Sequence, residues 1–286
     1  MTSRPWRIVD AFASEPFAGN PAAILLLEAD DELSDDLQQQ IAAEANLSET
    51  AFVRPRDDGR WDLRWFTPTA EVDLCGHATL AAGHVLLDEF RRGLDVGPDG
   101  EVLDHQEVVF VTRSGTLRAV KGKDGIIIDL PAVLAVPEWD ADLREAVGGA
   151  LGAQPVELLG TEHDPHEDRN LVAVYADAAT VRSLQPDMAE VAKLAGGVIA
   201  TAPADDPDVD IVSRYFTPQY GIPEDPVTGS AHCTLGPYWC QRLGKGILQA
   251  AQVSARGGRL GVRPWNDRVF LSGQAVTVVT GELRLP

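Results

Sequence analysis

The sequence predicts an α+β protein of two pseudo-symmetric lobes, each a barrel-like β-sheet wrapped around a central helix. The first observation is a duplication, because a strand ending in Phe-Thr-Pro at 66–68 recurs at 216–218. In both copies an acidic residue and then a glycine precede an apolar helix. The second observation is that the helix expected at 76–90 is apolar around most of its circumference, which indicates a buried helix. The third is the many short strands around each such helix, which favour the α+β class.

Composition limits the function classes. The chain has 286 residues, 44% of them hydrophobic, which is enough for a substantial core. Its net charge of −20 argues against nucleic acid and anionic membrane surfaces as partners, because both would repel it. The first ten residues lack the apolar core of a signal peptide, and no stretch approaches the roughly 18 apolar residues of a membrane span.

The chain has three cysteines, and this small, odd number does not indicate a disulfide framework. No Cys/His group has the spacing of a common zinc motif, so no metal is expected. We therefore expect a cytoplasmic protein with reduced thiols.

The first lobe is expected to open with strands and one amphipathic helix. Ser34 is the predicted N-cap of a helix at 37–45, and acidic residues follow it in the first turn, where the helix dipole favours them. The segment 91–106 is polar and is expected to be irregular. Strands are expected at 7–12, 22–27, 51–54, 62–66, 108–112, 116–120 and 126–130.

The second lobe is expected to carry helices at 140–147, 181–195 and 229–243, the last being its central helix. The segment containing His163 and His166 is expected to be a solvated loop rather than a metal site. Strands are expected at 169–175, 198–201, 211–216, 252–255, 259–262, 268–272 and 274–279. The lobes are expected to span 1–125 and 126–286, although the last strand could return to the first lobe.

Glu49 is the first candidate for chemistry. It is expected in a turn between a helix and a strand, among the apolar neighbours Leu47, Ala51 and Phe52. A carboxyl against apolar walls suits a general acid or base near neutral pH. The alternative is an ordinary glutamate in a surface turn.

Cys75, Gly76 and His77 open the first central helix. Gly76 permits close approach of a ligand to the backbone, and the free N–H groups of a helix start can hold a carboxylate. A thiol at this position has a lowered pKa. The alternative is a buried cysteine beside a histidine that caps its own helix.

Asp225, Thr228, Gly229 and Ser230 form the matching start of the second central helix. Thr228 takes the place of Cys75 and Ser230 that of His77. Asp225 could orient His77 or Ser230 across a cleft between the lobes, or these residues could simply be helix caps. The arginine before each Phe-Thr-Pro could meet an anionic substrate or be a surface charge.

These motifs resemble those of the PhzF family, the phenazine biosynthesis-like proteins, over essentially the whole chain. The resemblance rests on four ordered motifs. They are Asp-Ala-Phe at 10–12 with Phe-Ala-Gly-Asn-Pro at 17–21, Asn-Leu-Ser-Glu-Thr at 46–50, Phe-Thr-Pro at 66–68 with Cys-Gly-His-Ala-Thr at 75–79, and Glu-Asp-Pro-Val-Thr-Gly-Ser-Ala at 224–231.

The resemblance implies a diaminopimelate-epimerase-like fold and a cofactor-independent isomerase, often a homodimer, which moves a proton within a small carboxylated substrate. In the phenazine enzyme that substrate is trans-2,3-dihydro-3-hydroxyanthranilate. The family's acid/base residue falls on Glu49, and its other catalytic positions fall on His77, Asp225 and Ser230. Asn20 joins Cys75, Gly76, Thr228 and Gly229 as an expected substrate-binding position.

Two other functions stay open. An amino- or hydroxy-acid racemase or epimerase could use Cys75, although the second helix start has Thr228 where two-thiol enzymes of this fold place a second cysteine. A carboxylate- or partner-binding protein could keep the pocket without catalysis. The segment around Cys75 resembles the broad branch of the family rather than its phenazine-pathway members, so the resemblance does not transfer the substrate.

Overall fold

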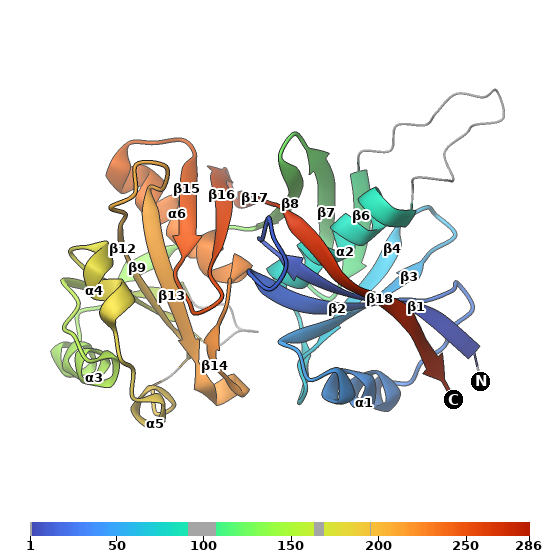
Figure 1. Cartoon of the computed structure of the whole chain (residues 1–286). Helices are drawn as coiled ribbons and strands as arrows, with labels where there is room; N and C mark the ends of the chain where they lie inside the picture. The colour runs from blue at the N-terminus through green and yellow to red at the C-terminus, as the bar shows by residue number, and fades with distance from the viewer. Residues whose placement is uncertain (1, 91–106, 163–168, 195) are drawn as a thin grey trace. The chain divides into compact units, whose positions relative to one another are not determined.

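The structure is a computed structural model that describes residues 2–90, 107–162, 169–194 and 196–286. The chain divides into two compact units, the first formed by Met1–Asp129 with Ser272–Pro286 and the second by Leu130–Leu271. Each unit is considered by itself below (Figure 1). The segments expected to be irregular at 91–106 and around His163 and His166 lie outside the described residues. Within the described residues no helix is both long and apolar enough to cross a membrane.

The first unit is a strongly curved sheet around one helix. The sheet runs in the order β18, β1, β2, β3, β4, β6, β7, with β2–β3 and β4–β6 parallel and the other pairs antiparallel. Its elements are β1 (Thr2–Ala11), β2 (Asn20–Leu26), α1 (Asp35–Ala45), β3 (Glu49–Pro55), β4 (Trp61–Phe66), β5 (Glu71–Val72), α2 (Gly76–His84), β6 (Glu107–Thr112), β7 (Gly115–Gly122), β8 (Gly125–Pro131) and β18 (Ala275–Leu285).

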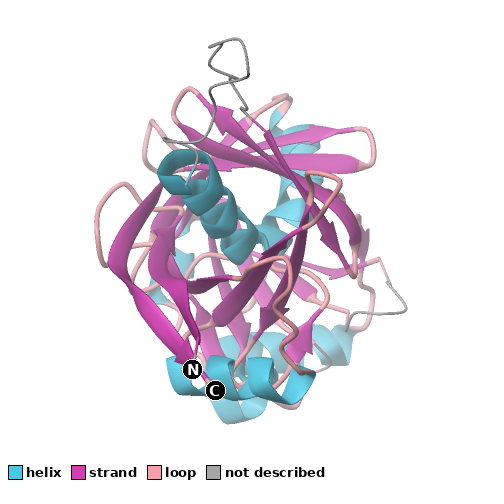
Figure 2. Cartoon of the chain, turned by 90° about the vertical axis from the view of Figure 1, so that its right-hand side faces the viewer, coloured by secondary structure: helices cyan, strands magenta, loops and turns pink. Residues whose placement is uncertain are grey.

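Helix α2 is the centre of this unit. It contacts β1, β2, β3, β7 and β18, and strands surround it in the view of Figure 2. Residues 76–83 are all buried, so the helix supplies the core for the inner face of the curved sheet. A side chain at Gly83 would meet the Cβ of Ala119 on β7, which explains the small residue at this close approach.

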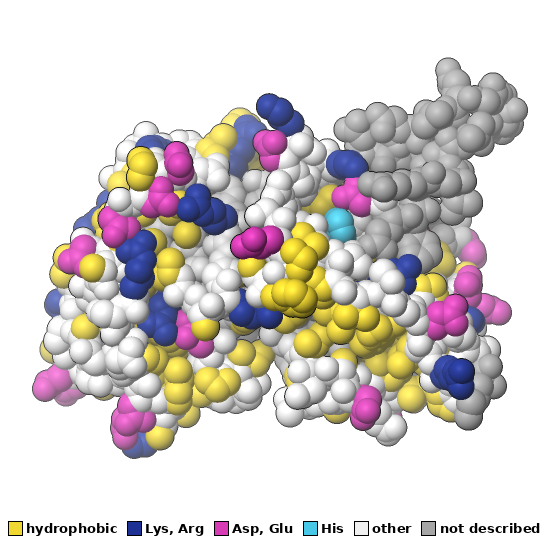
Figure 3. All heavy atoms as spheres, in the orientation of Figure 1, with side chains coloured by type: hydrophobic (Ala, Val, Ile, Leu, Met, Phe, Trp, Pro, Cys, Tyr) yellow, Lys and Arg dark blue, Asp and Glu magenta, His cyan; other side chains and the backbone are white. Residues whose placement is uncertain are grey.

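Helix α1 covers part of the outer face of the same sheet. Ser34 caps it by accepting a hydrogen bond from the Leu37 N–H, as expected from sequence. Its apolar side packs on a cluster that includes Leu25, Phe52 and Phe66. Apolar side chains also gather on the surface of this unit that Figure 3 shows. Val279 on β18 is 43% exposed.

The second unit repeats the plan of the first around helix α6. Strand β11 pairs in parallel with β12, β12 pairs antiparallel with β13, and β13 pairs in parallel with β15. Its elements are β9 (Ala135–Pro137), α3 (Ala141–Leu151), β10 (Glu157–Thr161), β11 (Leu171–Val174), α4 (Ala178–Ser183), α5 (Met188–Val191), β12 (Val198–Pro203), β13 (Ile211–Thr217), the 3-10 turn η3 (Pro218–Tyr220), β14 (Ile222–Asp225), α6 (Gly229–Leu243), β15 (Leu248–Gln252), β16 (Gly258–Trp265) and β17 (Arg268–Gly273).

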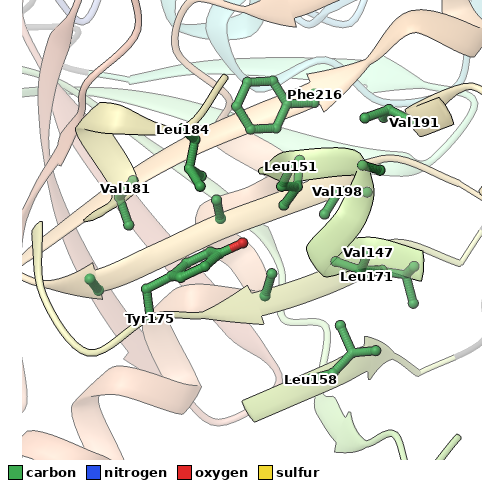
Figure 4. Packing of buried hydrophobic residues seen from close by; sticks show 14 of the residues in the cluster. Val147, Leu151, Leu158, Leu171, Tyr175, Val181, Leu184, Val191, Val198 and Phe216 are labelled. Carbon is green, nitrogen blue, oxygen red and sulfur yellow. The ribbon is translucent and has the colours of Figure 1, made fainter. Parts of the chain in front are cut away.

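A separate core lies between the sheet of the second unit and helices α3, α4 and α5. Tyr175 lies at its middle with Leu151, Leu158, Val181 and Phe216 around it (Figure 4). The phenol of Tyr175 donates to the Ala153 carbonyl at 3.1 Å, so its one polar group is satisfied within an apolar surrounding.

The predicted α+β class with a central helix in each half is confirmed, but several boundaries were wrong. Glu49 is the first residue of β3 rather than part of a turn. The helix expected at 76–90 becomes a π-helix at Val85–Phe90. The helix expected at 181–195 is two short helices, because the chain leaves the helix at Leu184, before Pro186. The strand expected at 252–255 is β15, which ends at Gln252.

Candidate active site

The first half of the candidate site is built where β2, β3 and α2 begin. Parallel pairing sets Ala22 opposite Glu49, which brings the starts of the two strands together. Side chains alternate along a strand, so Glu49 and Ala51 share the face of β3 that packs on α2. Asn20 starts β2 and Gly76 starts α2. We call Asn20, Glu49, Cys75, Gly76 and His77 the first half-site.

Its side chains are ordered around the imidazole of His77. Nδ1 of the ring lies 3.2 Å from the Asn20 amide nitrogen and 3.5 Å from the Cys75 sulfur. Nε2 lies 3.1 Å from a Glu49 carboxylate oxygen, Oε2. That contact has ion-pair distance without hydrogen-bond geometry, and neither Nε2 nor Oε2 has a hydrogen-bond partner among the described residues. A buried acid and a buried imidazole thus keep capacity for a ligand.

The charges of the half-site follow from burial and from proximity. Burial raises the pKa of the Cys75 thiol to about 11, so the thiol is neutral near pH 7. Burial alone would lower the pKa of His77, but the Cys75 sulfur and the Glu49 carboxylate outweigh it and hold that pKa well above its ordinary value.

The lowered thiol pKa expected at this helix start is therefore wrong. The side chain is 95% buried in the folded chain, and loss of water costs the thiolate more than the helix dipole returns. This weakens the thiol as a base.

Metal binding was considered for the same residues. Among the described residues, Glu49, Cys75 and His77 form a group whose possible ligand atoms all lie within 4.8 Å of one another. Cys75, however, lies near Nδ1 and Glu49 near Nε2, on opposite sides of one ring. An imidazole nitrogen binds a metal along its own lone pair, so one ion does not fit both neighbours with the ring in this position. The arrangement suits proton movement better, and the absence of a metal stays a prediction.

A second group of candidate residues lies in the loop from β14 into α6. Asp225 ends β14, Thr228 is the N-cap of α6 and Gly229 is the first helical residue. The Thr228 hydroxyl donates to the Asp225 carboxylate, so these two are joined as a pair. Ser230 lies half-buried in the first turn of the helix. We call Asp225, Thr228, Gly229 and Ser230 the second half-site.

The two central helices differ from the other helices at their first turn. Within the described residues, the side chains of Ser34, Asp140, Asp177 and Asp187 cap α1, α3, α4 and α5. Neither Cys75 on α2 nor Thr228 on α6 makes a side-chain cap. Simple capping therefore does not explain these residues. No side-chain cap occupies the first turn of either helix, and a carboxylate is a suitable acceptor for N–H groups at such a helix start.

The arginines before the two Phe-Thr-Pro motifs have a structural role instead of an anion-binding one. Arg64 makes a two-pronged ion pair with Glu71 and lies over the Phe66 ring. Arg214 does the same with Glu224 and Phe216. In each unit the pair ties the short strand to its neighbour, so the hairpin before the central helix is held in the same way twice.

Sequence reasoning missed two residues around the second half-site. Gln252 at the end of β15 bonds to Asp225 and Thr228, and His232 within α6 bonds to the Thr228 carbonyl. Both are almost fully buried. The available signals were a glutamine, Gln252, within an expected strand and a histidine, His232, within the expected central helix.

Comparison with known proteins then decides the family. The sequence profile of the phenazine biosynthesis-like proteins matches residues 9–281. The chain belongs to this PhzF family. An uncharacterized isomerase of Pseudomonas aeruginosa is 46% identical over 280 residues, covering 97% of each chain. The human phenazine biosynthesis-like domain-containing protein is 38% identical over 297 residues, covering 98% of each.

Solved structures agree with this assignment. The crystal structure of a PhzF family protein from Enterococcus faecalis matches with a TM-score of 0.85 at 38% identity, covering 99% of this chain and 100% of that one. A probable proline racemase from Agrobacterium radiobacter, at 10% identity and a TM-score of 0.61, shares the fold alone. Relatives over the full length of this PhzF protein are named isomerases, and it is an enzyme of that class.

Proposed function

We propose that this PhzF protein isomerises a small carboxylated substrate by moving a proton with Glu49, without a cofactor. The observation that carries the proposal is the buried pair of atoms, Oε2 of Glu49 and Nε2 of His77, which lie 3.1 Å apart and lack hydrogen-bond partners among the described residues. A carboxylate can take a proton from carbon and return it, and the neighbouring imidazole can donate to charge that develops on the substrate.

Asn20 and Cys75 would hold the ring of His77 for this task. The side-chain amide of Asn20 has an NH₂ donor and a carbonyl acceptor, so it can hydrogen-bond to Nδ1 of His77 whether or not Nδ1 carries a proton. The thiol adds a second contact at Nδ1. With Nδ1 occupied, Nε2 stays directed at Glu49 and at the reacting atoms.

Each half-site has groups that suit a small carboxylated substrate. The uncapped first turns of α2 and α6 suit the substrate's carboxylate, and Asp225 and Ser230 suit its polar substituents. This division of roles is part of the proposal, as are the cytoplasmic location and the homodimer implied by the family.

A comparison of the two units favours a single base. Thr50 pairs with Phe66 in the first unit, and Val198 pairs with Phe216 in the second. The residue before Val198 is Gly197, so it is the counterpart of Glu49. A side chain there would meet the ring of Tyr215. With a glycine in place of an acid at position 197 and a thiol that stays neutral, a two-base racemase that uses Cys75 is disfavoured.

Carbon-bound proton exchange tests the proposal. The protein is incubated in heavy water with trans-2,3-dihydro-3-hydroxyanthranilate and a panel of small amino and hydroxy acids, and deuterium at carbon is followed by NMR. We expect exchange or isomerisation that Glu49→Gln lowers by about 10² to 10⁴-fold and that Asp225→Asn also lowers. Glu44→Gln, at an exposed position on α1, is the matched control.

Full exchange by a folded Glu49→Gln variant would falsify the role of the base. Binding of a carboxylate without exchange of any of its protons would instead support the non-catalytic alternative.

A further inference from the structure

Gln252 is the buried residue that holds the second half-site from the side of the sheet. It is the last residue of β15 and is 1% exposed. Its side-chain oxygen accepts from the Thr228 N–H at 2.8 Å. Its side-chain nitrogen donates to the Asp225 carbonyl at 2.7 Å and to the Thr228 hydroxyl oxygen at 3.1 Å. One amide thus contacts both ends of the loop 225–228.

These contacts decide what the Thr228 hydroxyl does. A threonine at an N-cap ordinarily turns its oxygen to the N–H groups of the first turn. Here that oxygen accepts from Gln252, and its proton goes to the Asp225 carboxylate. The hydroxyl is therefore directed away from the helix, which agrees with the missing side-chain cap on α6.

The backbone of the loop is held separately. His232 donates from Nδ1 to the Thr228 carbonyl at 2.7 Å, and its Nε2 lies 3.3 Å from the Ser213 hydroxyl. Burial lowers the pKa of His232 to about 4, so the ring is neutral and Nε2 can accept. Ser254 donates to the Pro226 carbonyl at 2.7 Å. With the backbone tied elsewhere, the hydroxyl is the part of Thr228 that depends on Gln252.

We propose that Gln252 is a positioning residue of the candidate site, which turns the Thr228 hydroxyl onto Asp225 and so leaves the first N–H groups of α6 for the carboxylate of the substrate. The inference rests on the proposed function for the identity of the ligand. It predicts a specific failure when Gln252 is lost. The hydroxyl rotates back to the helix and caps it in competition with the substrate, and the Asp225 carboxylate loses the hydrogen bond from Thr228.

Two readouts test this, of which one needs no substrate. The variants are Gln252→Leu, Thr228→Val and their combination, with Gln249→Leu, at an exposed position of the same strand, as control. Amide hydrogen exchange of Ser230 and Ala231 is measured by NMR, since these N–H groups are the ones an N-cap oxygen protects. We expect slower exchange at Ser230 or Ala231 in Gln252→Leu only, and wild-type exchange in the combined variant, which has no hydroxyl to close the helix.

Kinetics with the substrate found by proton exchange give the second readout. Gln252→Leu should raise KM about tenfold and lower kcat, whereas Thr228→Val should lower kcat with little change in KM. The combination should return KM to the value of Thr228→Val. A purely structural role of Gln252 would make the combined variant worse than either single one, and that outcome overturns the proposal.

A third variant, Gln252→Glu, tests the same role if Gln252→Leu fails to fold. In Gln252→Glu the introduced carboxylate can accept from the Thr228 N–H but cannot donate to the Thr228 oxygen. We expect its KM to fall toward wild type as pH decreases and the new carboxyl gains a proton. A pH profile of KM parallel to that of wild type would count against the proposal.

The results also separate the two proposals. If Glu49→Gln still exchanges protons, the proposed function fails whatever Gln252 does. If Glu49→Gln is inactive while Gln252→Leu matches Gln249→Leu in exchange and kinetics, the role of Gln252 alone fails.

Discussion

At the scale of single residues, Cys75 distinguishes between two mechanisms, proton transfer by Glu49 and a racemase or epimerase reaction with the thiol as base. Its sulfur lies 3.5 Å from Nδ1 of His77, close enough for a hydrogen bond between the sulfur and the ring. Its pKa of about 11 keeps it protonated at pH 7, so it can orient the imidazole but is a poor base. A hydroxyl in the same place could make the same contact.

We therefore expect Cys75→Ser to keep proton exchange within about threefold of wild type. Cys75→Ala, which has no group that can hydrogen-bond to the ring, should lose about tenfold, because His77 is then less well oriented. The heavy-water assay measures both. If the thiol were the base, Cys75→Ser would lose as much as an acid/base residue contributes, about 10² to 10⁴-fold, and the racemase alternative would return.

The two buried histidines predict opposite pH dependences of stability. The pKa of His77 is raised in the folded state, so the folded chain binds an extra proton above pH 6.5. That stabilisation is complete below pH 6.5 and is lost as pH rises through the folded pKa. The pKa of His232 is lowered to about 4 in the folded state. Between pH 6.5 and 4 the unfolded chain therefore binds a proton that the folded chain does not, and the free energy of unfolding falls as pH drops.

Urea unfolding from pH 5 to 9 tests this pair. In wild type the free energy of unfolding should fall above pH 6.5 by up to about 1.4 kcal/mol per pH unit. His77→Gln should flatten this alkaline slope and leave the acidic one, whereas His232→Gln should do the reverse. Identical slopes in wild type and His77→Gln would show that His77 gains no proton on folding.

At the scale of elements, helix ends show which features sequence can predict. Ser34 was predicted as a cap because capping depends on residues within one turn, and the structure confirms it. Thr228 also suggests a cap, but its hydroxyl is taken by Asp225 and Gln252. Gln252 lies 24 residues away and reaches Thr228 only through the register of β15 beside β13. No local pattern carries that information.

The same distinction explains Glu49. Its motif identified it as a candidate, but its place as the first residue of β3 depends on pairing with β2. Asn20 starts the paired strand β2, whereas His77 comes from the first turn of α2. The residues of the first half-site were therefore predictable from motifs, while their order around the imidazole was not.

Ser34 gives the test that belongs to this scale. Its hydroxyl satisfies one N–H of α1, and removing it leaves that donor to water. We expect Ser34→Ala to lower the free energy of unfolding by about 1 kcal/mol in urea titrations. Ser14→Ala, in an exposed turn, should change it by less than about 0.5 kcal/mol. An equal effect of both substitutions would mean that the cap adds nothing to stability.

At the scale of the whole molecule, charge is the dominant feature. The chain has 44 acidic and 24 basic residues, so about half of the carboxylates cannot have a basic partner of their own. Ion pairs such as Lys193–Glu190 and Arg182–Asp205 lie at the surface, where each contributes little. Repulsion among the excess carboxylates acts on the compact state more than on the expanded chain.

This balance predicts that salt stabilises the fold. Raising NaCl from about 0.01 to 0.5 M shortens the screening length from about 30 Å to less than 8 Å, which weakens repulsion between distant carboxylates. We expect the Tm at pH 7.5, followed by circular dichroism, to rise by several degrees. Repeating the titration near pH 4.5, where the net charge is close to zero, supplies the control, because the electrostatic part of the rise should vanish there. A Tm that falls with salt at pH 7.5 would instead mean that the ion pairs stabilise the fold by more than the repulsion destabilises it.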